Sequence, residues 1–296
     1  MNSQGFIVFC FLLGIIGCQT GPAGRPVPPP PVDEKEDRLK TLEKGAGLAV
    51  EKFNYGQALV AFERALEQAE LFDDGERIRD YSHNIAWCLL KMDRAAEASV
   101  VLRRARAECG RRGIPWPGDS QLLLAEAEFM AGNPSGSQEE LRQVAHDGEG
   151  GRSFPVQFLT ALNALALGKR SLAEASLAEL PEPESIGEQA DRDYLAGQIA
   201  LAKSEYADAG AAFQRAAELR LEAGNPTGMA NALAGAGEAW LGAGDLMRAA
   251  DLYFRAGRSA LHADRSEKAR EWLSEARRLD ASSTIQSQAE ELLKRL

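Results

Sequence analysis

A short pattern of small and large apolar residues recurs along most of the chain. In each copy a small residue is followed four positions later by a large apolar residue, and three positions after that by a second small or aliphatic residue. Residues at this spacing lie on one face of an α-helix. The copies begin at Ala58, Ala98, Ser137, Ala173, Ala209, Ala249 and Ala269, with those at Ser137 and Ala173 weaker. Such self-similarity predicts a protein built from stacked helical units.

A second small residue lies twelve positions before most copies, and turn signals such as Gly132-Asn133-Pro134 lie in between. These positions are Ala46, Ala86, Ala125, Ala161, Gly197 and Gly237. The spacing predicts two antiparallel helices per unit, whose small residues face each other where the backbones are closest. Alanine, at 49 of 296 residues, is abundant for this reason, and an aromatic content of 7% argues against a β-sandwich or barrel.

This pattern resembles the tetratricopeptide repeat (TPR), whose unit is about 34 residues. The resemblance implies an all-α, right-handed α-solenoid of about six to seven antiparallel helix pairs over residues 38–296. The extra residues per unit are expected in the inter-repeat loops, at Phe72–Glu76, Gly110–Gly118, Gly148–Ser153 and Pro181–Gly187. The helix around Leu252–Ala263 is expected to serve two pairs. Thr284–Leu296 is predicted to be a C-terminal capping helix, with Ile285, Ala289, Leu292 and Leu293 facing inward.

The N-terminus has the pattern of an export signal. Phe6–Ile16 is an uncharged run of eleven apolar or glycine residues, too short to span a bilayer, which needs about 20. It ends in Ile15-Ile16-Gly17-Cys18, which resembles a bacterial lipobox. The resemblance implies a signal peptide at residues 1–17, a lipidated Cys18 and a proline-rich linker at 18–37. An ordinary secretory signal is the alternative. Gln19, where inner-membrane lipoproteins often have Asp, favours the outer membrane facing the periplasm.

Few residues suggest chemistry. A net charge of −10 disfavours nucleic acid, and no histidine has a second His or Cys at metal-ligand spacing. We therefore expect no enzyme activity, no cofactor, no metal site and no small-molecule substrate. The helix-pair register places Cys88 and Cys109 too far apart for a disulfide, so both are predicted to be free, with Cys88 buried.

A basic cluster stands out in this acidic chain. It comprises Arg103, Arg104, Arg106, Arg111 and Arg112. Its place near a predicted helix end suits the helix dipole. The alternative is contact with an acidic partner or with lipid headgroups, supported by the neighbouring Pro115-Trp116-Pro117. Trp116 is expected to be the more exposed of the four tryptophans.

The TPR resemblance implies that the first helix of each pair lines a concave groove that takes peptides or helices. The residues projected onto this groove are Asp80, His83, Trp87, Glu126, Phe129, Phe158, Tyr194, Gln198, Asn231 and Glu238. Their mixture of aromatic and acidic side chains suits an apolar segment with some basic residues. Alternatively, Trp87, Phe129 and Phe158 only pack between repeats.

These features predict a non-catalytic adaptor or scaffold, anchored by its N-terminal lipid, that binds a protein or peptide partner in the cell envelope. The chain is similar to repeat lipoproteins that assist outer-membrane barrel assembly or pilus secretin assembly. The alternative function is a regulatory or structural subunit of an export or cell-wall apparatus.

Overall fold

The computed structural model describes residues 34–146, 153–279 and 283–296, and every regular element in these ranges is an α-helix. The predicted signal peptide, Cys18 and most of the linker lie outside the described residues, as does most of the Gly148–Ser153 loop. No described helix is both long enough and apolar enough to cross a membrane. The helices are α1 (Glu34–Glu51), α2 (Tyr55–Leu71), α3 (Gly75–Lys91), α4 (Ala95–Arg112), α5 (Gly118–Met130), α6 (Pro134–His146), α7 (Phe154–Ala166), α8 (Arg170–Ala178), α9 (Ile186–Ala202), α10 (Tyr206–Glu222), α11 (Pro226–Gly242), α12 (Leu246–His262), α13 (Ser266–Leu279) and α14 (Ser283–Leu293).

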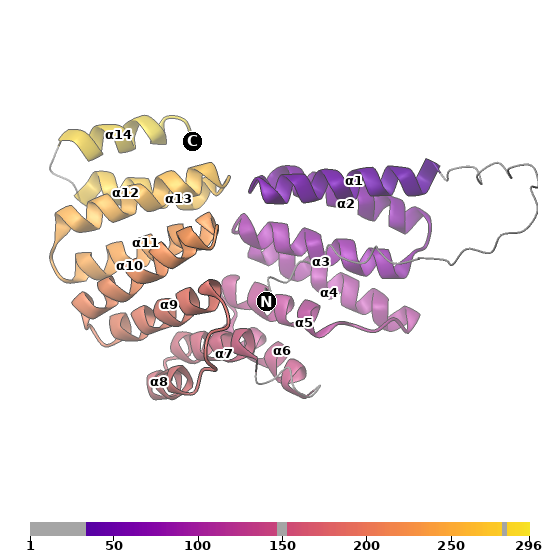
Figure 1. The fold of residues 1–296 in the computed structure, drawn as a ribbon, viewed down its shortest axis with the longest axis horizontal. Coiled ribbons are helices and arrows are strands. Elements are labelled where there is room, and N and C mark those ends of the chain that lie inside the picture. Colours follow the sequence, from indigo (N-terminus) through magenta and orange to yellow (C-terminus); the bar gives the residue numbers. More distant parts are fainter. Residues whose placement is uncertain (1–33, 147–152, 280–282) are drawn as a thin grey trace, which may run out of the picture.

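Consecutive helices pack against each other in pairs, α1 with α2 through to α11 with α12, and the pairs stack into an α-solenoid (Figure 1). The all-α, helix-pair fold class is therefore confirmed. Small residues of the sequence pattern are fully buried, among them Ala46 and Ala58 in the first pair and Ala86 and Ala98 in the second. In the fifth pair, Phe213 of α10 packs so closely on Gly197 of α9 that a Cβ there would lie 2.8 Å from its ring. The Phe213 ring also lies against Gly235 of α11, so it packs between this pair and the next.

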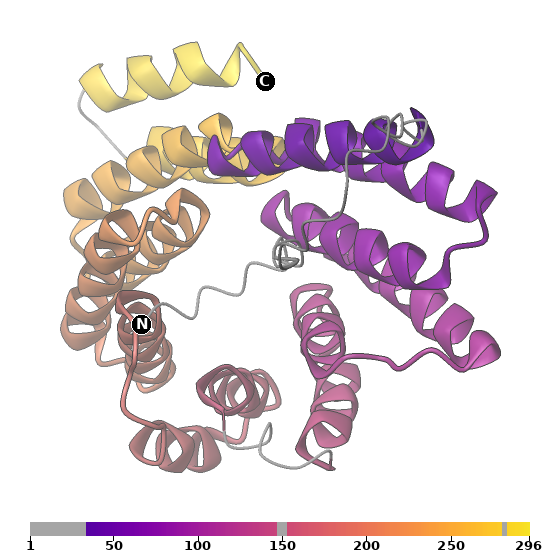
Figure 2. The same ribbon diagram turned by 45° about the vertical axis from the view of Figure 1, so that its right-hand side comes forward.

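The first helices of the pairs form the inner layer of the solenoid. Successive first helices touch one another, α3 with α5, α5 with α7, α7 with α9 and α9 with α11. In a curved array the helices on the concave side lie closer together than those on the convex side, so these contacts place the first helices on the concave side. The solenoid curls so that the N-terminal arm, α1–α4, faces the C-terminal arm, α9–α14, with α5–α8 joining them (Figures 1 and 2).

The C-terminal end agrees with the sequence prediction. Helix α12 packs on both α11 and α13, and it also touches α14, so the roles of first and second helix shift by one after α12. Helix α14 covers the end of the array. It buries Ala289 fully and packs Ile285, Leu292 and Leu293 against the core of the C-terminal arm.

Two boundaries differ from the prediction. The helical array begins at Glu34, before the expected boundary at residue 38, because Glu34–Asp37 is an acidic stretch of the kind that stabilises a helix N-terminus. The Phe72–Glu76 segment is only a tight turn between α2 and α3. The extra residues of that unit extend the helices to 17 or 18 residues. Extended linkers do occur at 113–117 and 179–185, as predicted.

Candidate protein-binding face

Three candidate residues lie on α3, and each has an intramolecular partner. The Asp80 carboxylate accepts a hydrogen bond from Arg79 (2.8 Å). His83 Nδ1 lies 2.9 Å from Ser120 Oγ of α5. The half-buried Trp87 ring packs edge-on against Tyr55, with ring centroids 5.5 Å apart, and the Lys91 ammonium lies 5.3 Å from it. Burial lowers the pKa of His83, while Asp119 and Asp80 act in the opposite direction.

The candidate aromatics of the middle repeats are half-buried and packed. Phe129 of α5 lies against the small apolar core of α5–α7. Phe158 of α7 stacks on Phe154, with centroids 6.3 Å apart. These contacts fit the packing alternative for the two rings, and they leave part of each ring at the surface.

Tyr194 and Gln198 lie one turn apart on α9 and are joined by a hydrogen bond from Gln198 Nε2 to the Tyr194 hydroxyl (3.1 Å). The Tyr194 ring packs edge-on against Phe213, and the Arg220 guanidinium lies 5.3 Å from its centroid. Arg220 also pairs with Asp191 of α9.

Asp191 of α9 shares its electrostatic environment with a carboxylate of another first helix. Burial raises the pKa of Asp191, Arg220 opposes this rise, and Glu126 of α5 adds to it. Helices α5 and α9 of the inner layer therefore each carry a carboxylate whose charge acts on the other.

The last candidates lie on α11. Glu238 is exposed, whereas the Asn231 side-chain oxygen accepts a hydrogen bond from Arg265 at the α12–α13 turn (2.7 Å). Asn231 is thus committed to a contact that the sequence did not predict.

Arg265 joins the two arms. Its side chain is 1% exposed, and its guanidinium pairs with Asp93 of the α3–α4 turn, 172 residues away (Nη2 to Oδ1, 2.8 Å). The same guanidinium donates to the Thr227 carbonyl (3.2 Å) and lies 5.4 Å from the centre of the Trp272 ring. Four groups from both arms therefore surround one buried cation.

Further contacts between turns lie beside this pair, and we call the whole region the closure seam. A Cβ on Gly224 would lie 3.9 Å from the Phe53 ring, and a Cβ on Gly56 would lie 3.9 Å from Asp264. The Tyr55 side chain neighbours Thr227. The residues of the closure seam are Phe53, Tyr55, Gly56 and Asp93 on the N-terminal arm and Gly224, Thr227, Asp264 and Arg265 on the C-terminal arm.

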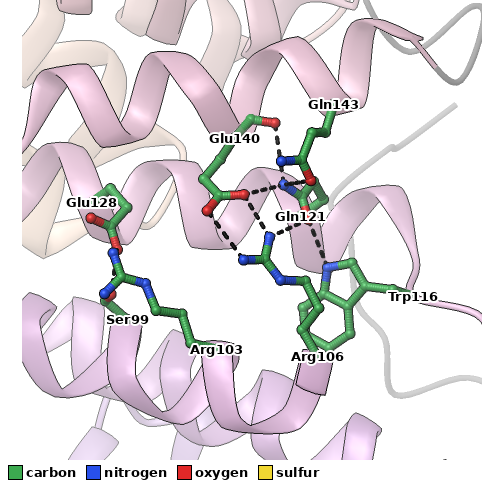
Figure 3. Close-up of polar contacts among 8 residues, drawn as sticks. All are labelled: Ser99, Arg103, Arg106, Trp116, Gln121, Glu128, Glu140 and Gln143. Atoms are coloured by element: carbon green, nitrogen blue, oxygen red, sulfur yellow. Dashed lines mark hydrogen bonds and ion pairs between the residues drawn. The ribbon is translucent and has the colours of Figure 1, made fainter. Parts of the chain in front are cut away.

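The predicted basic cluster is paired with acids of the same chain. Figure 3 shows Arg103 directed at Glu128, whose side chain is only 4% exposed and which lies 2.6 Å from the guanidinium. Glu128 also accepts hydrogen bonds from Ser99 and from Asn133 (2.8 Å). Arg104 pairs with Glu70, and Arg111 and Arg112 pair with Glu108.

A second branch of this network holds α4, α5 and α6 together. Arg106 binds Glu140 (2.6 Å), Gln121 donates to the same carboxylate (2.5 Å), and Trp116 Nε1 donates to Gln121 (2.9 Å) (Figure 3). Trp116 is half-buried, as are Trp87 and Trp240, whereas Trp272 is buried. The Trp116 indole is retained by the Gln121 hydrogen bond and by the N-terminal core.

Cys88 and Cys109 are free, as predicted, and both are buried. Burial raises the pKa of the Cys88 thiol to about 12. Among the described residues, no group of three or more His, Cys, Asp or Glu side chains is placed to hold a metal ion.

No protein-family model matches the chain, and neither does any curated protein sequence. Among solved structures, it is similar to a tetratricopeptide repeat protein from Parabacteroides merdae, with a TM-score of 0.47 at 14% identity over 87% of this chain and 98% of that one. It is also similar to the C-terminal part of a TPR repeat-containing protein from Cytophaga hutchinsonii, with a TM-score of 0.41 at 15% identity over 82% and 97%. A third likeness is to the TPR2AB domain of yeast Sti1, in a complex with pHSP90, with a TM-score of 0.36 at 18% identity over 88% and 98%. The fold class follows from the helix pairing itself: an all-helical solenoid of stacked pairs.

Proposed function

We propose that this protein is a non-catalytic adaptor that binds a protein or peptide segment on the inner face of its solenoid. The observation that carries the proposal is the inner layer of first helices, which gathers aromatic and acidic side chains from both arms. Glu126 and Asp191 lie close enough for their charges to interact, and Glu238 is exposed on the same layer. A segment with apolar and basic side chains complements this face.

We place the adaptor in the cell envelope, held by acyl chains on Cys18 and facing the periplasm. The lipobox-like run before Cys18 supports this part of the proposal. A single acyl chain binds membranes only marginally, whereas two or more anchor stably. The Cys18→Ser variant should therefore move from the membrane fraction to the soluble fraction. Retention of the variant in membranes would contradict the anchor.

The binding face is tested by capture of partners from detergent-solubilised membranes. We expect Glu126→Arg with Glu238→Arg to reduce recovery of specific partners at least tenfold, because two carboxylates become cations. Glu63→Arg with Glu218→Arg is the matched control, since these exposed acids lie on the second helices α2 and α10. Equal recovery with both double variants would contradict the inner face as the binding site.

The identity of the captured proteins distinguishes two roles. Outer-membrane barrels or secretins would support an assembly adaptor, and glycan-modifying enzymes would support a regulatory subunit of a cell-wall apparatus. Circular dichroism of each variant confirms that the helical array is intact before capture is compared.

A further inference from the structure

We infer that the Asp93–Arg265 pair is a latch that holds the two arms of the solenoid together and limits access to its inner face. The claim that the latch limits access to the inner face rests on the proposed function. The claim that it holds the arms together does not. The pair is the centre of the closure seam, and Arg265 is 1% exposed while Asp93 is 21% exposed. One side of the latch is thus anchored inside the C-terminal arm, and the other approaches from a turn.

The contact between the arms is narrow. Extensive helix packing among the described residues runs between neighbours in the stack, whereas the seam is made by turns and helix ends. Its central interaction is an ion pair, and both charges would become hydrated once the arms separate. Such a contact can open without unfolding either arm.

Three turns at the seam have a left-handed residue that carries a Cβ. This position after a helix is glycine at Gly132, Gly168 and Gly244 outside the seam and at Gly224 within it, and it is Asp73 or Ser204 at two further turns outside the seam. At the seam the same type of position is held by Phe53, Asp93 and Asp264, with φ of 57°, 61° and 57°. Residues with a Cβ adopt this conformation at a cost in free energy. At Asp93 this cost is offset by the ion pair that its side chain forms with Arg265 across the seam.

The strain provides a test that separates closure from stability. Asp93→Gly removes the carboxylate but also relaxes the turn, so the helical content should be retained while closure is lost. Ser204→Gly is the matched control, because Ser204 has φ of 61° at the α9–α10 turn and is exposed away from the seam. Asp93→Asn provides a second variant that removes the charge and tolerates the left-handed backbone.

Closure is measured in the full chain by double electron–electron resonance between spin labels at Lys52→Cys and Glu222→Cys. These exposed positions flank the seam on opposite arms. Buried Cys88 and Cys109 react slowly, and a chain without the two introduced cysteines measures their background. We expect one short distance in the parent and in Ser204→Gly, and an added longer-distance population in Asp93→Gly and Asp93→Asn.

Unchanged distances in both Asp93 variants would overturn the latch, and so would the same change in Ser204→Gly. Partner capture is then repeated with Asp93→Gly. Increased capture supports control of access to the inner face. A longer distance without increased capture would support the latch but contradict its effect on access to the inner face. The proposed function is tested separately, by loss of capture in Glu126→Arg with Glu238→Arg.

Discussion

Single carboxylates differ widely in what they contribute to this fold. Glu128 is buried between α4 and α5 and accepts from Ser99, Arg103 and Asn133. Glu139 forms an exposed pair with Arg142 on α6, with side chains more than half exposed. The contrast predicts that burial and the number of donors, rather than the presence of an ion pair, decide the stability contribution.

We expect Glu128→Ala to lower the free energy of unfolding by about 2 kcal/mol, because three donors lose a charged acceptor. Glu139→Ala should change it by less than about 0.5 kcal/mol, as is usual for exposed pairs. Urea unfolding of both variants followed by circular dichroism measures the difference. Equal effects would show that the network in Figure 3 contributes no more to the free energy of unfolding than an exposed ion pair does.

His83 gives the fold a defined pH dependence. Burial lowers its pKa in the folded state below the ordinary value of 6.5. The unfolded chain therefore binds a proton first as pH falls, and the free energy of unfolding decreases below about pH 6.5 until the folded-state pKa is passed.

We expect His83→Asn to flatten this decrease, since the asparagine amide can replace Nδ1 beside Ser120 but does not titrate. Unfolding free energies at pH 7.5 and 5.5 test the expectation. Asp191 has the opposite sign, because its raised pKa favours the folded state as pH falls. Asp191 is present in both the parent and the variant, so the difference between their two slopes reports His83. A slope that is identical in the parent and the variant would contradict the assignment to His83.

At the level of the helix, closeness of packing decides whether glycine is required. Gly197 lies where α9 crosses α10, and a Cβ would meet the Phe213 ring at 2.8 Å. Gly45 lies in the middle of α1 with no atom within 4 Å of a Cβ placed there. Both are interior helix positions, so intrinsic helix propensity affects them equally.

We expect Gly197→Ala to destabilise the protein by about 1–3 kcal/mol, because Phe213 is fully buried and must shift. Gly45→Ala should stabilise it by up to about 1 kcal/mol through helix propensity alone. Thermal unfolding of the two variants gives the comparison. Stabilisation by both substitutions would mean that the α9–α10 crossing has room for a methyl group.

The sequence was sufficient to predict helix pairs and their crossings, because Ala58, Phe62 and similar residues repeat at the spacing that close packing requires. It was less informative about unit length, since longer helices and longer loops give the same interval between Ala58 and Ala98. The acid partners of the basic cluster were also not predictable. Glu128 and Glu140 belong to a chain with 44 acidic residues, and only the stacking of α4, α5 and α6 selects them.

For the whole molecule, the closure seam could not be predicted from sequence patterns. The meeting of Asp93 and Arg265 depends on the summed rotation of every unit between them, and a small change in each would separate the arms. The candidate face was projected one helix at a time, so it included Asn231 without the Arg265 that occupies it. Turns without glycine do not mark the seam either, because Ser204 holds outside it the same left-handed position that Asp93 holds within it.

Closure also changes how the protein is expected to fold and unfold. In an open repeat array each unit depends only on its neighbours, so the ends can fray independently of one another. Here the α3–α4 and α12–α13 turns are bonded across 172 residues, so loosening of the last units also removes support from the second. Because contacts between distant residues carry a large loop-closure entropy, the arms should assemble first and join last. The seam thereby makes a one-dimensional stack cooperative from end to end.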